Sequence, residues 1–333
     1  MNTSDNIAKL GELVATAKTI LVLQPDSPDG DSLGSALGLE EVLGDLGKTV
    51  VMFAYKEPEP YLRGNEGWDR VSQSWPKQYD FTILVDTGSP ALIKATLEHY
   101  HSELVSKPVV IIDHHYLSRT DFGFPTIDII AQDCAAAETV TQICLDLGWP
   151  INEQAAAKLA TAILSDSLNL TTPYTTAHSV EMLAELVRDG ANLHNLYRQK
   201  RELSALSPEL LHLKGQLLSS VEFFCDGKLA LTEIPPEMVH RYKDVYEPYS
   251  LVLNEMQWVK GVELVAIFKN YGTKINVPLR SGTGVASQVA ERFGGGGHAS
   301  ASAYRCATTD YPAEKQKLID AFTLFLEEQH ATP

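Results

Sequence analysis

The sequence has 333 residues, about twice the length of a typical domain, so we expect two domains. Hydrophobic residues make up 44% of the chain and charged residues 21%, a composition that excludes a mainly disordered protein. The 27 Lys and Arg residues are outnumbered by 43 Asp and Glu residues. The resulting net charge of -16 repels long duplex DNA and argues against it as a partner.

No stretch of the sequence is suited to crossing a membrane. The longest apolar runs, residues 19–23, 109–112 and 264–268, are far shorter than the roughly 18 residues that a membrane span needs. Residues 1–5 lack the basic and apolar segments of a signal peptide. The four cysteines form no CxxC pair, so we expect neither a disulfide framework nor a zinc ribbon. These features predict a cytoplasmic protein that binds no membrane.

Short β-branched runs alternate with helical patterns in the first half of the chain. The expected strands are residues 19–23, 49–54, 81–85 and 109–112, and the expected helices are residues 33–46, 136–147 and 153–164. Gly47 follows the first of these helices as a natural C-cap. Strands that alternate with helices predict an α/β domain with a parallel sheet, which we place at residues 1–185.

The second half of the chain begins with a helical pattern and then returns to strands. We interpret residues 179–220 as continuous helix and residues 186–220 as the connector between two domains. The expected strands that follow are residues 228–233, 264–270 and 273–279, before a helix at residues 285–293. They predict a second, smaller α/β domain at residues 221–328.

Carboxylates and histidines follow four apolar segments at the point where each segment ends. These residues are Asp29, Asp31, Asp86, His114 and Asp166. Because the carboxyl ends of parallel strands lie at one edge of a sheet, we expect their side chains to converge. Crowded carboxylates repel one another unless cations hold them, and carboxylates with one imidazole and no thiolate favour Mn²⁺ or Mg²⁺. A single Asp after a strand is usually a helix N-cap, but four such segments indicate a site for two divalent metal ions.

The remaining histidines and one glutamate lie outside these motifs. Glu138 is expected to support the acidic site from the start of a helix. Surface or packing roles are expected for His101, His178, His194, His212 and His240, which lie apart from the acidic motifs in the sequence.

The motifs resemble those of the DHH/DHHA1 phosphoesterases, a family named for the triplet found here at Asp113–His115. The segments 28–31, 85–88 and 164–167 are similar to its other N-terminal motifs, and residues 293–298 (FGGGGH) are similar to the signature of its DHHA1 domain. The closest match is to the nanoRNase and pAp-phosphatase members, while RecJ-type exonucleases and family II pyrophosphatases are more distant. The resemblance implies an N-terminal parallel-sheet DHH domain, a helical connector and a smaller α/β DHHA1 domain, with the active site in the interdomain cleft.

The resemblance also implies roles for individual residues. One metal ion would be held by Asp31, Asp86, His114 and Asp166, and the other by Asp29 and the bridging Asp86. His115 would contact the scissile phosphate, and Asp113 would orient its neighbours. The expected substrate-binding residues are His115, Arg280, Ser281, Gly295, Gly296, Gly297 and His298. Backbone N–H groups of the glycines can approach a phosphate without a Cβ clash. The alternative is a flexible turn, which is less favoured because four consecutive glycines are entropically costly without a use.

One position departs from the family pattern. The first motif usually begins with a metal-binding histidine four residues before the first aspartate, and Pro25 stands there in this chain. Our hypothesis is that Asp26, or less favourably Gln24, replaces the missing ligand. The competing hypothesis is an impaired first metal site in a slow enzyme or a binding module.

The expected function is metal-dependent hydrolysis of a short oligonucleotide, from di- to pentanucleotides such as pApA or pGpG, or of pAp, to mononucleotides. Mn²⁺ is the favoured cofactor, and Mg²⁺ stays open. The alternatives are an inorganic pyrophosphatase or short-chain polyphosphatase, and a nucleotide-binding protein with an impaired first metal site. The expected ligand is a short oligonucleotide or nucleotide, and a homodimer is compatible with the sequence.

Overall fold

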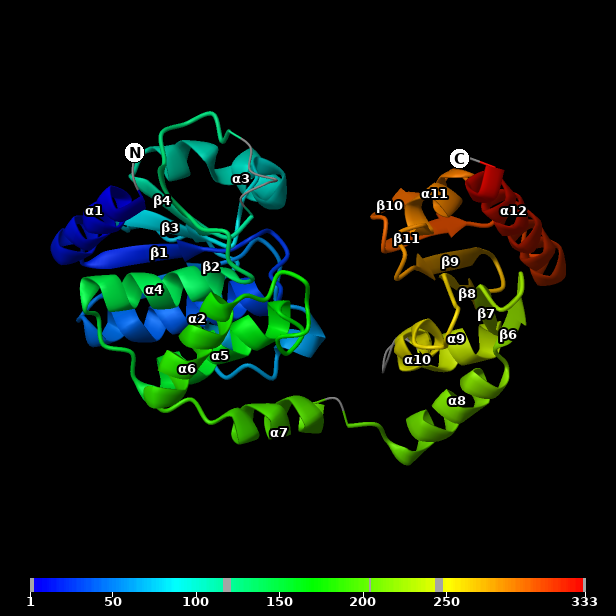
Figure 1. The fold of residues 1–333 in the computed structure, drawn as a ribbon. Coiled ribbons are helices and arrows are strands. Elements are labelled where there is room, and N and C mark those ends of the chain that lie inside the picture. Colours follow the sequence, from blue (N-terminus) through cyan, green and yellow to red (C-terminus); the bar gives the residue numbers. More distant parts are fainter. Residues whose placement is uncertain (1–2, 116–120, 204, 243–247, 332–333) are drawn as a thin grey trace. The chain divides into compact units, whose positions relative to one another are not determined.

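A computed structural model describes residues 3–115, 121–203, 205–242 and 248–331 (Figure 1). The chain divides into two compact units, residues 1–205 and 206–333. This division falls inside the segment 186–220 that was expected to connect two domains.

The first unit is built on a parallel sheet of five strands in the order β2-β1-β3-β4-β5. The strands are β1 (Thr19–Leu23), β2 (Thr49–Phe53), β3 (Phe81–Val85), β4 (Val109–Asp113) and β5 (Ile127–Ile130). The α/β class and the first four strands agree with the sequence prediction. β5 was not predicted, because it is only four residues long and contains Asp128.

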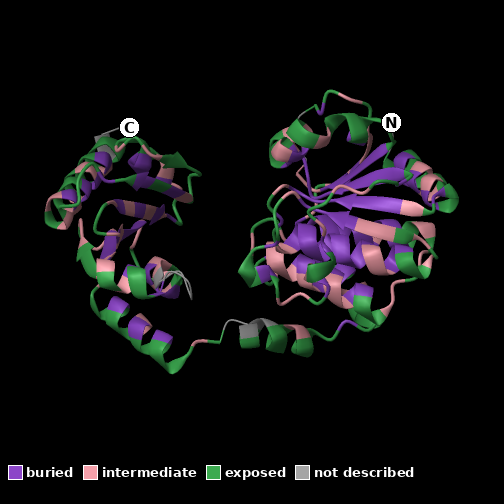
Figure 2. Cartoon of the chain, turned by 180° about the vertical axis from the view of Figure 1, so that it is seen from behind, coloured by how far each residue is buried: buried purple, intermediate pink, exposed green. Residues whose placement is uncertain are grey.

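Helices cover both faces of this sheet, and the strand core is almost wholly buried (Figures 1 and 2). One face packs against α1 (Thr3–Thr16), α2 (Gly30–Asp45) and α4 (Ala136–Leu147), and α5 (Glu153–Asp166) and α6 (Ala177–Arg188) pack on α2 and α4 as a further layer. The other face packs against α3 (Lys94–Val105) and the turn before it. Alternate strand residues therefore contribute to two hydrophobic clusters, as expected for a sheet buried on both sides.

Helices α2 and α5 pack with very little space between them. A Cβ atom added to Gly30 would lie 2.1 Å from Ser165 Oγ, and one added to Gly34 would lie 2.7 Å from Ala162 Cβ. Gly38 faces Leu159 in the same way, with a closest approach of 2.6 Å. The spacing of four residues places these glycines on one face of α2. The close approach brings the end of α5, with Asp166, beside the start of α2, with Asp31.

The segment expected as one continuous helix is three helices in the structure. These are the end of the first unit's α6, then α7 (Leu193–Leu203) and α8 (Pro208–Ser219). Gly190 has a φ of 109°, which ends the α6 segment, and the Ser207 side chain accepts a hydrogen bond from Leu210 N at the start of α8. Glycine in the left-handed region and a Ser-Pro helix start are both chain breaks that interrupt the apolar periodicity.

The second unit contains a six-stranded sheet in the order β10-β11-β9-β8-β7-β6. The strands are β6 (Glu222–Phe224), β7 (Leu229–Ile234), β8 (Leu264–Asn270), β9 (Ile275–Arg280), β10 (Gly296–Gly297) and β11 (Ala301–Arg305). All neighbouring pairs are antiparallel except β7 with β8. Helices α11 (Ala286–Glu291) and α12 (Tyr311–Ala331) cover one face, and α8, α9 (Pro236–Tyr242) and α10 (Leu253–Gln257) cover the other.

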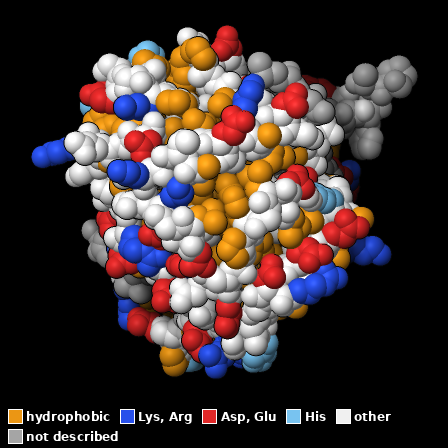
Figure 3. Space-filling model, turned by 90° about the vertical axis from the view of Figure 1, so that its left-hand side faces the viewer, with side chains coloured by type: hydrophobic (Ala, Val, Ile, Leu, Met, Phe, Trp, Pro, Cys, Tyr) orange, Lys and Arg blue, Asp and Glu red, His pale blue; other side chains and the backbone are white. Residues whose placement is uncertain are grey.

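Short 3₁₀ helices lie at Pro60–Leu62, Trp68–Arg70, Pro90–Ile93 and Pro248–Leu251. Among the helices of the described residues, none combines the length and apolar character needed to span a bilayer. On the face of the first unit shown in Figure 3, hydrophobic side chains lie at the centre, with charged side chains of both signs around them.

Candidate metal centre

Side chains from four separate segments of the first unit meet at the carboxyl edge of its sheet. They belong to Asp31 in the first turn of α2, Asp86 after β3, His114 and His115 after β4, and Asp166 at the end of α5. His114 lies at the centre: its Nε2 is 3.4 Å from Asp86 Oδ1, 3.6 Å from Asp166 Oδ2 and 3.8 Å from Asp31 Oδ2. This set of carboxylates and imidazoles is the donor chemistry that Mn²⁺ and related divalent ions accept.

Asp86 is the most unusual of these residues. Its backbone has a φ of 54°, a conformation that residues other than glycine rarely adopt. The residue is only 3% exposed. Its Oδ1 atom is buried and accepts no hydrogen bond. Burial, reinforced by the charges of Asp31 and Asp29, holds the pKa of Asp86 well above its ordinary value. A buried, unpartnered carboxylate oxygen beside imidazole nitrogens fits a site that holds a cation.

Asp31 is held in place by the start of α4. Its carboxylate accepts hydrogen bonds from the backbone N–H groups of Ala136 (2.5 Å) and Ala137 (3.2 Å) and from the Ser35 hydroxyl (3.1 Å). Burial nevertheless raises the pKa of Asp31 to about 7, against the lowering effect of His114. A cation would remove this cost, since it favours the ionised carboxylate.

The two histidines of the triplet are oriented by different groups. His114 Nδ1 lies 3.3 Å from the backbone carbonyl oxygen of Asp133. His115 Nδ1 lies 2.9 Å from Asp113 Oδ1, and Asp113 Oδ2 accepts from the His115 backbone N–H. The hydrogen bond to Asp113 raises the pKa of His115, despite partial burial of the ring. Gly88 allows this arrangement, because a Cβ there would lie 2.7 Å from both Asp113 Oδ2 and His115 Cβ.

Asp29 and Asp26 act as helix caps. Asp29 is exposed and its Oδ1 accepts from the backbone N–H groups of Asp31 and Ser32 at the start of α2. The Asp26 carboxylate accepts three hydrogen bonds from the first turn of α3, from Ala95 N (2.6 Å), Thr96 N (3.1 Å) and Thr96 Oγ1 (2.7 Å). Asp26 is not among the ligand atoms that meet around His114, and it is not among the charges that act on Asp31 and Asp86.

Gln24, which the sequence made the second choice, has a different environment. It directly follows β1, is completely buried, and neither its Oε1 nor its Nε2 has a hydrogen-bond partner. β1 pairs in parallel with β3, so Gln24 stands next to the end of the strand that leads into Asp86. A buried amide without hydrogen bonds lowers the stability of the fold, so a polar partner for Gln24 would be stabilising.

Similarity to known proteins agrees with the cluster of carboxylates and histidines around His114. Residues 19–165 match the model of the DHH family, N-terminal domain. Over this segment the chain is similar to the DHH family. The chain is 27% identical over 316 residues to the bifunctional oligoribonuclease and PAP phosphatase NrnA of Thermus thermophilus, covering 93% of this chain and 90% of that protein. It is 24% identical over 303 residues to the protein of the same name from Bacillus subtilis, covering 87% and 91%.

A solved structure supports the same fold over both units. It is an exopolyphosphatase-related protein from Bacteroides fragilis with a TM-score of 0.81, 21% identical and covering 97% of this chain and 98% of that chain. The resemblance expected from the motifs is thus confirmed for the family and the fold class.

The end of the DHH domain is followed by strained backbone. Leu168, Asn169 and Leu170 have φ values of 47°, 61° and 64°, all in the left-handed region. This run begins two residues after Asp166 and directs the chain away from the end of α5. Such strain is found at functional sites, where the surrounding structure maintains it.

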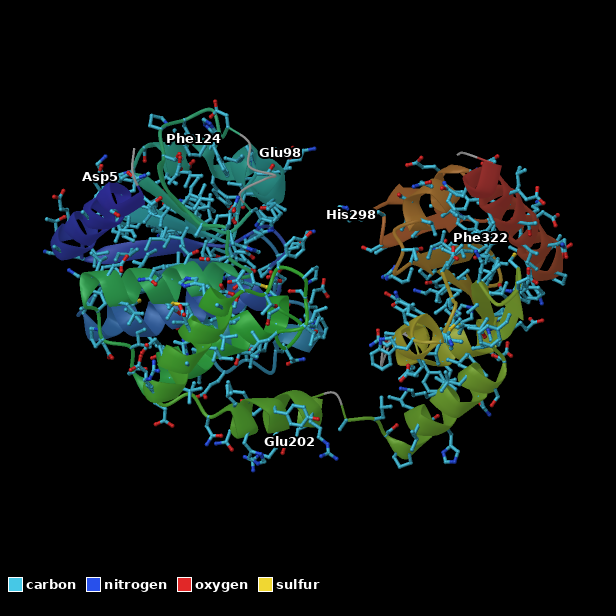
Figure 4. All side chains as sticks on the ribbon, in the orientation of Figure 1. Asp5, Glu98, Phe124, Glu202, His298 and Phe322 are labelled. Atoms are coloured by element: carbon cyan, nitrogen blue, oxygen red, sulfur yellow. The ribbon has the colours of Figure 1, made fainter. Side chains whose placement is uncertain are left out.

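The substrate-binding residues expected in the second unit lie together at one edge of its sheet. Arg280 ends β9 and pairs with Ala301 of β11, and the Ser281 backbone N–H donates to Ser300 O. Cβ atoms added to Gly295 and Gly297 would lie 2.3 Å and 2.7 Å from backbone carbonyl oxygens of β11, so these glycines permit the β10–β11 hairpin. His298 is exposed at its turn and points away from the sheet (Figure 4).

Gly296 and Ser281 differ in how accessible they are. No atom lies within 4 Å of a Cβ added to Gly296, so open space lies beside it. Ser281 is only 2% exposed, and its hydroxyl donates to Glu263 O at 2.7 Å. Its hydroxyl therefore already has a structural partner.

A second group of titratable side chains in the first unit was not predicted. Asp133, Glu138 and His178 each offer a ligand atom within 4.8 Å of the other two. His178 was expected to have a surface or packing role apart from the acidic motifs; it lies beside Asp133, which belongs to none of those motifs. Only Asp133 and Glu138 are close in the sequence, so the sequence carries no signal for the contribution of α6.

Proposed function

We propose that this protein is a metal-dependent phosphoesterase that hydrolyses short oligonucleotides, of two to five residues, and pAp to mononucleotides. The relatives that support this share about nine tenths of their length with this chain and are named as oligoribonucleases and PAP phosphatases. The observation that carries the proposal is the buried, unpartnered Oδ1 of Asp86 between two histidines and two further carboxylates.

The proposed metal ligands are Asp31, Asp86, His114 and Asp166 for one ion and Asp86 with Asp29 for the other. Mn²⁺ is favoured over Mg²⁺ because an imidazole is among the ligands. When bound, two such ions supply an activated water and neutralise charge on the phosphoryl group. Asp26 is not included in this proposal, because it is neither among the ligand atoms that meet around His114 nor among the charges that act on Asp31 and Asp86.

The protein's own residues would orient and stabilise the phosphate. His115 has a raised pKa through Asp113, so its ring is protonated more readily and donates a hydrogen bond to a phosphate oxygen. Asp113 fixes the ring through two hydrogen bonds and is therefore a positioning residue. In the second unit, Arg280, His298 and the backbone of Gly296 are proposed to bind the nucleotide, since guanidinium, imidazole and N–H groups all donate to phosphate.

The test is hydrolysis of a panel of substrates with Mn²⁺ present: pApA, pGpG, pAp and pyrophosphate. Release of mononucleotides from the dinucleotides or of AMP from pAp is expected, with a loss of at least about 10²-fold in Asp86→Asn. Asp146→Asn, an exposed carboxylate on α4 whose partner is Gln142, is the matched control and is expected to retain full activity. Cleavage of pyrophosphate alone would overturn the proposed substrate class.

A second candidate is a nucleotide-binding protein with an impaired first metal site. The specific observations that favour it are Pro25 at the position of the family's histidine and the engagement of Asp26 by α3. It predicts that the panel is bound but not hydrolysed, and that the ions bound at the Asp86 centre number one per chain rather than two.

A further inference from the structure

A second cluster of ligand atoms, from Asp133, Glu138 and His178, adjoins the candidate metal centre, because the backbone carbonyl of Asp133 contacts His114 Nδ1. Asp133 precedes α4, Glu138 lies in the first turn of α4, and His178 lies in the first turn of α6. His178 Nε2 is 3.8 Å from Asp133 Oδ1. Asp133 Oδ2 accepts from the Thr139 hydroxyl at 2.8 Å, an interaction that fixes the carboxylate and leaves Oδ1 facing the imidazole.

The burial of Glu138 distinguishes this cluster from a group of surface carboxylates. Its side chain is completely buried, and neither carboxylate oxygen has a hydrogen-bond partner. Ser179 and Cys134 lower the pKa of Glu138, but burial has the larger effect and raises that pKa to about 7. A buried carboxylate whose oxygens accept no hydrogen bond of normal geometry, within 4.8 Å of ligand atoms of a second carboxylate and an imidazole, favours a proton or a cation.

We propose that Asp133, Glu138 and His178 form a third divalent cation site, separate from the pair of ions at Asp86. Two carboxylate oxygens and one imidazole nitrogen are a donor set for Zn²⁺ or Mn²⁺, whereas Mg²⁺ prefers oxygen alone. Bonds of about 2.0–2.2 Å place two ligand atoms about 3–4 Å apart, and the Asp133–His178 distance already lies in that range. The His178 side chain is 34% exposed and provides the route of entry from solvent, whereas that of Asp133 is 10% exposed.

This ion would stabilise the segment that positions the catalytic centre. The Asp133 carbonyl oxygen contacts His114 Nδ1, and the N–H groups of Ala136 and Ala137 hold Asp31. The proposed ligands Asp133 and Glu138 lie at the two ends of this segment. A cation bound there therefore fixes the partners of two proposed ligands of the Asp86 centre without contacting the substrate.

The test counts bound ions on the full-length, metal-free protein after equilibrium dialysis against Mn²⁺ or Zn²⁺, by mass spectrometry of the metal. With at least one of these ions, His178→Ala and Asp133→Asn are each expected to bind one ion per chain fewer than wild type. His212→Ala, which removes an exposed histidine of the second unit, is the matched control and is expected to lose none. Circular dichroism confirms that the variants are folded.

A second pair of variants separates this site from the Asp86 centre. In an Asp86→Asn background, adding His178→Ala is expected to remove one further ion, whatever the state of the first centre. Equal counts in wild type, His178→Ala and Asp133→Asn for both metals would overturn the proposal. Equal counts in wild type and Glu138→Gln would also overturn it, because they would show that a proton shared by Glu138 satisfies the pocket.

Discussion

The glycines of α2 allow close packing against α5, and they predict opposite changes in stability for two glycine-to-alanine substitutions in α2. Gly34→Ala would place a Cβ 2.7 Å from Ala162 Cβ and 3.0 Å from the backbone oxygen of Lys158, where ordinary contacts are 3.4–4 Å. Neither atom can rotate away, so α5 must retreat by roughly an ångström. Overpacking of this kind costs about 1–3 kcal/mol, against a gain of up to about 1 kcal/mol from the better helix propensity of alanine.

Gly44→Ala is the matched control at the other end of α2, since nothing lies within 4 Å of a Cβ there. We expect Gly34→Ala to destabilise the first unit by about 1–2 kcal/mol and to lower its Tm by roughly 3–6 °C. Gly44→Ala is expected to raise the Tm by a few degrees. Differential scanning calorimetry measures both. If Gly34→Ala is as stable as Gly44→Ala, the contact between the helices is not as tight as inferred.

The retreat of α5 also has a functional readout. Asp166 is the last residue of α5, so its carboxylate would move away from His114, now 3.6 Å distant. Gly34→Ala should therefore weaken binding of Mn²⁺ by about 10-fold or more, while Gly44→Ala leaves it unchanged. Isothermal titration of the metal-free variants provides the measurement.

Three further predictions follow from the pKa values and from Gln24. Because the pKa of Asp31 is about 7 in the fold and near 4 in the unfolded chain, the metal-free protein binds more protons when folded. Its stability to urea should fall as pH rises from about 4 to about 7, and Mn²⁺ should abolish that fall; a rise would contradict the assignment. Gln24→Met removes two unpartnered buried atoms and should stabilise the metal-free protein by about 1–3 kcal/mol, and a loss of stability would reveal a missed partner. Asp113→Asn should lower the pKa of His115, shifting the alkaline limb of the kcat profile to lower pH and reducing kcat at pH 7 by about 10²-fold; an unchanged profile would exclude His115 as a donor.

Much of the first unit could be predicted from the sequence, because its strands are continuous β-branched runs. β1 and β3 begin and end where the pattern places them. β10 could not be predicted, since it consists of two glycines that pair only because β11 returns beside them. The interruption of the connector at Gly190 was missed for a different reason: the apolar spacing continues across a residue whose backbone conformation ends the helix.

The candidate site followed from the sequence where ligands stand at strand ends, as Asp86 and His114 do. The role of Asp26 did not, because its partners Ala95 and Thr96 lie about 70 residues away and only the fold brings them close. The same holds for His178, which meets Asp133 through the packing of α6. Local sequence patterns indicate which kinds of ligand a segment contains. Long-range packing decides whether a given carboxylate, such as that of Asp26, lies at the candidate metal centre or caps a helix elsewhere.

The Nδ1 atoms of the adjacent residues His114 and His115 face different groups, and this difference suits the two imidazoles to different chemical roles. The Asp133 carbonyl can only accept a hydrogen bond, so it fixes the proton of His114 on Nδ1 and presents the Nε2 lone pair as a Lewis base. The hydrogen bond to the Asp113 carboxylate raises the pKa of His115, so His115 is suited to act as a Brønsted acid. Two identical side chains, one residue apart, are thus suited to opposite chemistry, because one faces a backbone carbonyl and the other a carboxylate.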